Sequence, residues 1–361
     1  MMRRSLAHHG NSVDAFDTRW LPGRVRTDDL QLVELDPSAI GDRDAGQLAA
    51  VANAAAAVDA PPLPAIDAAH VRGRLAYGHD MTPATALHVA RSADGQIVAA
   101  GELHRSRWDN AHVAILEVET SPAHRGRGIG DSLLARLEEG ARALGCTELL
   151  AEAWVGSHRE TFWQRHGFSV GSVAASRRLW MSQLDMPRLQ ALLEEAAAAS
   201  SGYDLIDLPN PAPDALVPQL LELHLAMNDS PLDDLRLDDD EWPVERFRAY
   251  EDAMRQRGMR LHRLVAQRRS DGVLGGHTVV AVDAARPTLG MQEDTAVVSG
   301  HRGHRLGLRL KIAMLQQLVQ REPQLHFVDT WNAESNAHMI AINDALGCVV
   351  VGRVVEVQRR A

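Results

Sequence analysis

Arg125-Gly126-Arg127-Gly128-Ile129-Gly130 is the stretch around which this chain is organised, because it joins an apolar run at 113–118 to a helical pattern at 132–144. A strand that enters a glycine-rich turn and then a helix directs several backbone N–H groups and the positive end of the helix dipole at one place. Glycine lets the main chain approach an anion closely and adopt a positive φ. The stretch therefore predicts a site for phosphate or pyrophosphate, and a basic surface turn is the plainer alternative.

A second copy of the turn favours the phosphate interpretation. Arg302-Gly303-His304-Arg305-Leu306-Gly307 follows an apolar stretch at 295–299 and opens a helical pattern at 308–319. Gly130 and Gly307 are 307 − 130 = 177 residues apart, and Gly167 and Gly347 are 347 − 167 = 180 apart, so both halves keep nearly the same spacing. Duplication of one domain explains both offsets. The 361 residues suffice for two domains, each with its own core.

Composition and charge narrow the class of protein. Apolar residues make up 45% and charged residues 24% of the chain, which is ordinary for a globular protein. No apolar segment approaches the roughly 20 residues of a membrane span, and residues 1–28 lack the apolar region of a signal peptide, so we expect a cytoplasmic protein without a membrane partner. The net charge of -10 disfavours nucleic acid as a partner. Cys146 and Cys348 predict free thiols, and the histidine spacing predicts no metal site.

The apolar pattern restarts near the middle of the chain. The first half predicts a strand at 30–35, helices at 45–58 and 66–75, a three-strand meander at 87–119, the turn and its helix, a strand at 148–155, a short helix at 159–166, and one or two strands at 168–181. After a leucine- and alanine-rich helix at 186–200, the same order follows from 203 to 357, with its fourth strand at 295–299. We therefore predict an α+β fold with mixed sheets, divided into a tail at 1–28, a first domain at 29–185, a linker helix at 186–202 and a second domain at 203–361.

This element order, with an Arg-x-x-Gly-x-Gly turn, resembles the GNAT (N-acetyltransferase) superfamily in both halves. The first half carries the signature best, in Arg125 to Gly130 followed by Leu133-Leu134. The second half has Arg305 at the position of the middle glycine, and its turn keeps its shape if Arg305 has an unstrained φ. The stretch from Asn336 to Asn343 resembles a later motif of the family. The resemblance covers nearly everything after residue 28 and implies two tandem GNAT folds. In this layout the chain is similar to duplicated actinobacterial members of the family.

The resemblance also implies a function. Proteins of this family transfer an acetyl group from acetyl-CoA to an amine, and the amides of the turn hold the CoA pyrophosphate. The expected acceptor is a primary amine, either a small molecule or a peptide, and the oligomeric state stays open. The residues expected to bind acetyl-CoA are Val118, Thr120, Arg125, Gly126, Arg127, Gly128, Ile129 and Gly130 in the first half, and Val297, Arg302, Gly303, His304, Arg305, Leu306, Gly307 and Asn336 in the second.

Transfer to an amine requires a base, and acidic residues near the predicted clefts are candidates. We favour Glu119, Glu152 and Glu293, with solvated strand-edge carboxylates as the alternative. The family often has a tyrosine that protonates the departing CoA thiolate, four residues before the glycine that corresponds to Gly167 and Gly347. At these positions this chain has Trp163 and Asn343. A thiol leaving group with a pKa of ~8.5 can take its proton from water. A non-catalytic acyl-CoA-binding protein and a transferase of a longer acyl group remain alternatives, and either half could be catalytic.

Acidic residues crowd the segment at 229–241, where only Arg236 opposes them. In the family this segment borders the groove for the acceptor. We therefore hypothesise that Asp238 to Asp240 receive a cationic amine, with a solvated acidic loop as the alternative.

Overall fold

The computed structural model describes residues 30–78 and 81–361, and the predicted tail at 1–28 lies outside the described residues. The first half contains β1 (Leu30–Leu35), α1 (Asp42–Asp59), α2 (Ala68–Tyr77), β2 (Ala86–Ser92), β3 (Ile97–His104), β4 (Val113–Thr120), α3 (Ile129–Ala143), β5 (Glu148–Trp154), α4 (His158–Arg165) and β6 (Ser169–Trp180). The segment predicted as one or two final strands is therefore a single strand.

The second half repeats this order after the predicted linker helix. It contains α5 (Met186–Ala199), β7 (Tyr203–Leu208), α6 (Val217–Leu225), α7 (Val244–Gln256), β8 (Met259–Arg268), β9 (Leu274–Asp283), β10 (Leu289–Val297), α8 (Leu306–Arg321), β11 (Phe327–Ala333), α9 (Ala337–Leu346) and β12 (Val349–Arg360). The predicted α+β class and the internal repeat are confirmed. β10 begins at Leu289 rather than at residue 295, because pairing with β9 and β11 extends the strand beyond its apolar part.

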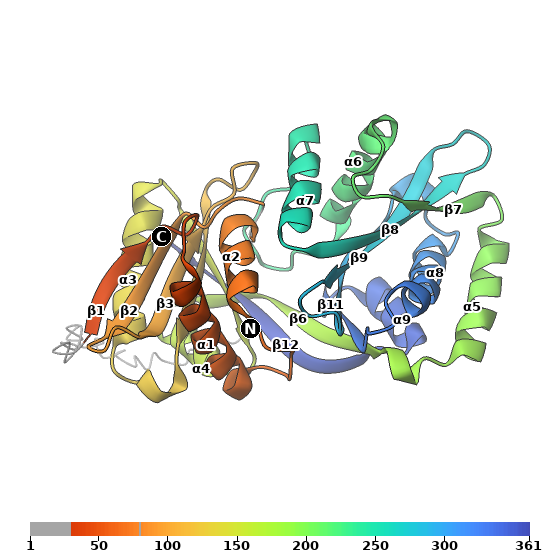
Figure 1. The fold of residues 1–361 in the computed structure, drawn as a ribbon. Helices are drawn as coiled ribbons and strands as arrows, with labels where there is room; N and C mark the ends of the chain where they lie inside the picture. Colours follow the sequence, from red (N-terminus) through yellow and green to blue (C-terminus); the bar gives the residue numbers. More distant parts are fainter. Residues whose placement is uncertain (1–29, 79–80) are drawn as a thin grey trace, which may run out of the picture.

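The two halves exchange their last strands. Within the described residues all strands form one sheet in the order β1-β2-β3-β4-β5-β12-β6-β11-β10-β9-β8-β7. β12 of the second half thus lies between β5 and β6 of the first, and Val357 pairs with Ala151 on one side and Val170 on the other. Figure 1 shows the C-terminal end of the chain among the first-half strands. Local sequence patterns did not predict this exchange.

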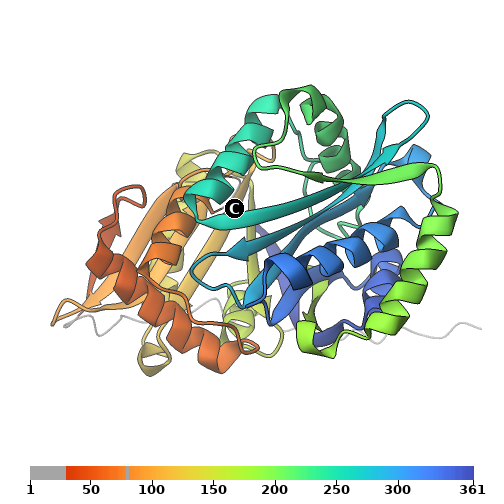
Figure 2. The ribbon, with the colours of Figure 1, turned by 45° about the vertical axis from the view of Figure 1, so that its right-hand side comes forward.

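Helices cover both faces of the sheet, and the core alternates along the strands (Figure 2). Leu87 and Val89 of β2 pack under α1 and α2, whereas Ala90 faces the cluster formed by α3. Val355 and Val357 of β12 belong to that α3 cluster, so the second half supplies part of the first-half core. α5 is more than a connector, because Leu189 and Ala196 pack against α8.

Cys146 and Cys348 are free thiols, as predicted, and Cys146 is buried. Among the described residues no helix has both the length and the apolar composition needed to cross a membrane.

The substitution Val357→Ala tests the strand exchange. Val357 is fully buried, so removing two methyl groups should lower the free energy of unfolding by about 1–3 kcal/mol. Hydrogen exchange should become faster in β5 and α3, which touch Val357 only because the strands are exchanged. Val349→Ala is the matched control, since Val349 is 46% exposed on the same strand. Faster exchange restricted to α9 and β11 would contradict the exchange.

Candidate active site

The first glycine-rich turn opens α3 at the mouth of a cleft between two strands. β4 and β5 pair only from Val113 to Ile115 and then separate. Gly126 and Gly128 have φ angles of 74° and 77°, and Gly128 is the N-cap of α3. A cavity of about 190 Å³ lies beside the turn. A turn of this shape at a helix N-terminus presents main-chain N–H groups to an anion such as pyrophosphate.

The arginine that opens each turn holds the turn in place. Arg125 Nε donates to the carbonyl oxygen of Thr120 at 3.2 Å, and its guanidinium group pairs with Asp59. Arg302 Nε donates to the carbonyl oxygen of Val297 at 3.1 Å, and its guanidinium group pairs with Asp229. Because both guanidinium groups already have partners, the main-chain N–H groups are the donors that each turn offers to an anion.

The second turn has the same outline and one strained residue. β10 and β11 also separate after three paired residues, from Leu289 to Met291. Arg305 is the N-cap of α8 with a φ of 55°, the left-handed conformation that glycine adopts in the first turn. This conformation costs a residue with a Cβ about 1–2 kcal/mol. The second turn thus keeps its shape with Arg305 in a strained conformation, and the condition of an unstrained φ is not met. Its side chain pairs with Glu195 of α5 at 2.7 Å.

Arginines neutralise the carboxylates nearest the first-half cleft. Glu119 pairs with Arg159 of α4; burial raises the pKa of Glu119, and Arg159 opposes that rise. Arg74 of α2 donates to both carboxylate oxygens of Glu102, at 2.5 and 2.7 Å, and lies 3.4 Å from Glu117. Glu119 and Glu117 are therefore held as ion pairs.

Glu152, the third candidate base, lies on the exposed side of β5. In the sheet it is directly opposite Glu356 of β12. Of the three candidate bases, Glu119 is therefore held in an ion pair and Glu152 is exposed, which leaves Glu293.

Glu293 has no side-chain hydrogen bond or ion pair in the part of the chain that the structure describes. The pairing of β10 with β9 is interrupted between Gln292 and Thr295, so Glu293 and Asp294 form a bulge. Gln292 Nε2 donates to the carbonyl oxygen of Val279 at 2.6 Å and ties the bulge to the sheet. Burial, with a smaller contribution from Asp294, raises the pKa of Glu293 to about 7. Such a carboxylate can accept a proton from an amine near neutral pH.

Glu293 lines a cavity of about 490 Å³ between the two halves. Figures 1 and 2 show α2 of the first half beside α7 of the second, and this pair forms part of the wall. Aromatic and apolar walls with a few charged groups are typical of small-molecule sites. The lining includes His70, Tyr77 and Met81 from the first half and Trp242, Tyr250, Met254, Arg257, Met291 and Trp331 from the second.

Two buried histidines lie behind Asp294. The ligand atoms of His224, His277 and Asp294 lie within 4.8 Å of one another, and His224 Nδ1 is 2.8 Å from Asp294 Oδ2. The His224 ring stacks on Trp242 at 4.2 Å. Burial lowers the pKa of His277 to about 3, so its imidazole is neutral. The donor set would suit a divalent cation, but the direct contact with His224 by itself holds Asp294 at the cavity wall. The histidine spacing gave no sign of this cluster, because its members come from three elements.

A buried polar chain occupies the second half near α9. Lys311 Nζ donates to Asn343 Oδ1 at 2.8 Å, and Asn343 Nδ2 donates to Asn332 Oδ1 at 2.6 Å. Burial lowers the pKa of Lys311 to about 8. Asn336 Oδ1 accepts from the N–H of Met339 at 3.1 Å and caps α9, so this oxygen already has a partner. Sequence analysis missed Lys311, because a lysine in a helical pattern reads as a solvated residue.

Trp163, at the corresponding position of the first half, belongs to the core. It is fully buried, and its ring lies 5.0 Å from that of Phe162 and 4.9 Å from that of Phe168.

The acidic segment at 229–241 joins the two halves and does not line the cavity. Asp233 accepts a hydrogen bond from the Ser172 hydroxyl at 2.9 Å, and Arg236 pairs with Glu148 at 2.6 Å. The carbonyl oxygen of Asp238 accepts from Asn110 Nδ2 at 3.1 Å. Asp238 to Asp240 are not among the residues that line the cavity of Glu293, so the hypothesis that they receive the amine gains no support from this cavity and stays a prediction.

Comparisons with known proteins agree with this architecture. Residues 59–168 match a family model described as the acetyltransferase (GNAT) family. A tandem GNAT protein from the clavulanic acid biosynthesis pathway, solved without acetyl-CoA, is 27% identical, with a TM-score of 0.74 over 92% of this chain and 98% of that one. A GCN5-related N-acetyltransferase from Sphaerobacter thermophilus is 15% identical, with a TM-score of 0.66 over 92% and 95% of the two chains. No protein of curated function matches.

The substitution Lys311→Met tests the buried ammonium group. The pKa of Lys311 falls from 10.5 to about 8 on folding, so between these values the unfolded chain binds more protons than the folded one. The free energy of unfolding should therefore rise with pH from 8 to 10.5, by an amount on the order of 3 kcal/mol. Denaturant unfolding across this range should show the rise in the wild type and lose it in Lys311→Met. Parallel curves would show that Lys311 titrates normally.

Proposed function

We propose that this chain, a GNAT acetyltransferase with two tandem GNAT folds, transfers the acetyl group of acetyl-CoA to a primary amine by direct attack within a ternary complex. The observation that carries the proposal is the unpaired carboxylate of Glu293, at the wall of the inter-domain cavity and just beyond the point where β10 and β11 separate. The second half would then carry out the chemistry, with its own acetyl-CoA at Arg302 to Gly307.

The proposed reaction uses few protein groups. Glu293 accepts a proton from the ammonium form of the acceptor, and the resulting amine attacks the thioester carbonyl. A main-chain N–H at the free edge of β10, near Val297, stabilises the developing oxyanion. The carbon–sulfur bond then breaks, and the CoA thiolate leaves with its electron pair. The nitrogen then loses its second proton to water, and the thiolate, whose thiol has a pKa of ~8.5, takes up a proton from water.

The first half is proposed to bind acetyl-CoA without turnover. Its turn has glycine at both left-handed positions, and it opens onto the 190 Å³ cavity. Its carboxylates Glu119 and Glu117 are neutralised by Arg159 and Arg74, so neither is available as a base. Val118, Thr120 and the amides from Gly126 to Gly130 would contact the bound molecule. Acyl groups longer than acetyl are the competing possibility, and competition between acyl-CoA chain lengths would settle the preference.

The substitution Glu293→Gln tests the proposed base. Loss of the base should lower kcat by roughly 10²- to 10⁴-fold, with little change in acetyl-CoA affinity. In the wild type, kcat/KM should rise with pH through about 7, because the base works only when it is deprotonated. Asp294 and Arg257 are the charged groups that influence this titration. The variant should lose the inflection near 7. Release of CoA thiol with a panel of primary amines measures both effects.

Glu152→Gln is the matched control, because this change also removes one strand carboxylate but at an exposed position. It should leave kcat and the pH profile unchanged. If Glu293→Gln keeps wild-type kcat while Glu152→Gln loses it, the base has been misassigned. If the wild type binds acetyl-CoA but releases no thiol with any amine, the chain is a binding protein rather than a transferase.

A reciprocal pair of substitutions tests the two turns. Gly128→Val places a β-branched side chain at a φ of 77° in the first glycine-rich turn. We therefore expect acetyl-CoA to bind this turn at least 10-fold more weakly. Arg305→Gly removes the left-handed strain of the second turn and should preserve or strengthen binding there. Calorimetric titration of both variants and the wild type resolves the two sites. Unchanged binding in Gly128→Val would contradict a role for the first turn.

A further inference from the structure

Arg257 is a second unpartnered charge in the inter-domain cavity. It follows the last residue of α7, and within the described residues its side chain makes no hydrogen bond or ion pair. Neighbouring arginines behave differently. Arg286 lines the same cavity and donates to Asp283 at 2.9 Å, whereas Arg74 is neutralised by Glu102. A partly buried guanidinium group without a partner is unfavourable unless a ligand completes its contacts.

The fold makes room for this side chain. Gly73 lies within α2, and a Cβ at this position would be 3.3 Å from Arg257 Cγ. Glycine inside a helix is about 1 kcal/mol less favourable than alanine. Because Gly73 has no side chain, the aliphatic part of the Arg257 side chain, its stem, can pack closely against α2 of the first half. The position of the stem is thus built from both halves of the chain.

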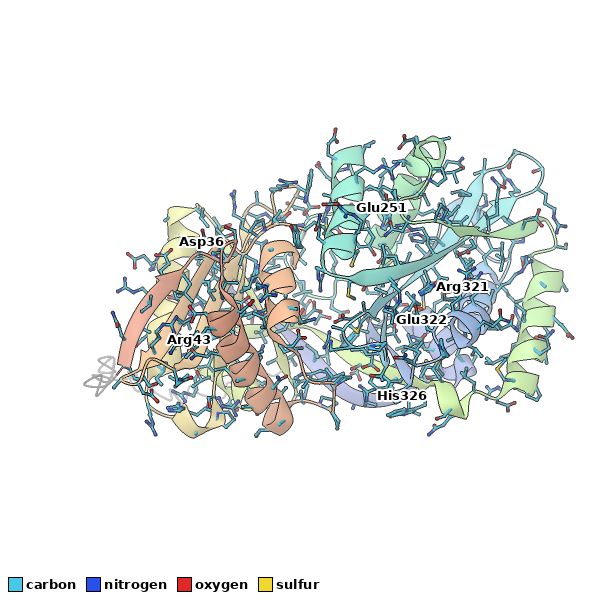
Figure 3. All side chains as sticks on the ribbon, in the orientation of Figure 1. Asp36, Arg43, Glu251, Arg321, Glu322 and His326 are labelled. Atoms are coloured by element: carbon cyan, nitrogen blue, oxygen red, sulfur yellow. The ribbon has the colours of Figure 1, made fainter. Side chains whose placement is uncertain are left out.

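Buried contacts also fix the helix that carries Arg257. Glu251 of α7, labelled in Figure 3, accepts hydrogen bonds from Arg263 Nη1 and from the N–H of Ala212, both at 2.9 Å. Glu251 and Arg263 are almost fully buried. The end of α7 therefore does not depend on the charge of Arg257, and substitution of Arg257 should leave the helix in place.

Arg257 and Glu293 are close enough for Arg257 to lower the pKa of Glu293, yet they form no ion pair. Two opposite charges thus line one cavity, and each lacks a partner. A molecule with an ammonium group and a carboxylate would satisfy both charges at once.

Resting on the proposed function, we infer that the acceptor is an amino acid or short peptide, whose carboxylate binds Arg257 while its amine faces Glu293. The rest of the cavity suits an apolar or aromatic side chain, because Tyr250, Trp331, Met254 and Met291 form its walls. Its volume of about 490 Å³ leaves room for such a molecule.

The test uses L-phenylalanine, L-leucine and L-methionine with their carboxamides as matched probes. Each amide keeps the amine and side chain but lacks the negative charge. The wild type should acetylate the acids more efficiently than the amides, by roughly 10- to 100-fold in kcat/KM, the range expected for one charged hydrogen-bonding partner. Arg257→Gln should raise KM for the acids by a similar factor and leave KM for the amides unchanged. Thiol release measures all four combinations.

Arg255→Gln is the control on the same helix, because Arg255 is exposed and pairs with Asp252. It should leave both substrate classes unaffected. Gly73→Ala should act in the same direction as Arg257→Gln, since the added methyl group presses on the arginine stem. An equal change for acids and amides in Arg257→Gln, or a wild-type preference for the amides, would overturn the inference.

Direct binding separates this inference from the proposed function. If no amine releases thiol, but calorimetry shows that the acids bind the wild type and not Arg257→Gln, the carboxylate site stands and acetyl transfer is rejected. If other amines are acetylated while the acids neither bind nor react, transfer stands and the carboxylate site is rejected.

Discussion

Main-chain hydrogen bonding between β12 and its two neighbours is the interaction on which the rest of the structure depends. β12 completes the sheet of the first half, and β6 occupies the equivalent place beside β11. Because hydrogen bonds of a sheet fix both register and spacing, the halves cannot turn freely against each other. The cavity between α2 and α7 therefore has a defined width, and residues from both halves can act on one bound molecule.

The duplicated halves have diverged in complementary directions. The first half keeps glycine at both left-handed positions of its turn, but arginines occupy its carboxylates. The second half accepts strain at Arg305, yet its bulge leaves Glu293 unpaired. An anion-binding turn depends on main-chain shape, whereas a base depends on an unpaired side chain, so one can be lost while the other persists. In the proposed function, the first half keeps acetyl-CoA binding and the second half provides the base.

Sequence reasoning succeeded where the signal was local. The alternation at 87–119 and the turn at 125–130 predicted three strands and the start of α3, because strand period and glycine chemistry act over a few residues. It failed where partners are distant. The pairing of Val357 with Ala151, the His224–Asp294 contact and the cavity around Arg257 arise from tertiary packing. Composition also could not reveal that residues of the acidic segment contact Ser172 and Asn110 of the first half. The sequence also could not reveal the arginine partners of Glu119 and Glu117. For this reason it gave no ground for choosing among the candidate bases Glu119, Glu152 and Glu293.

The place of β12 also constrains the order in which the molecule is made. A ribosome releases the first half long before residue 349 exists, so β5 and β6 emerge with open edges and no strand between them. Unpaired edges of this kind can join other nascent chains. During translation the first half therefore cannot complete its sheet until β12 has been synthesised, and the edges of β5 and β6 must until then be shielded or only loosely folded.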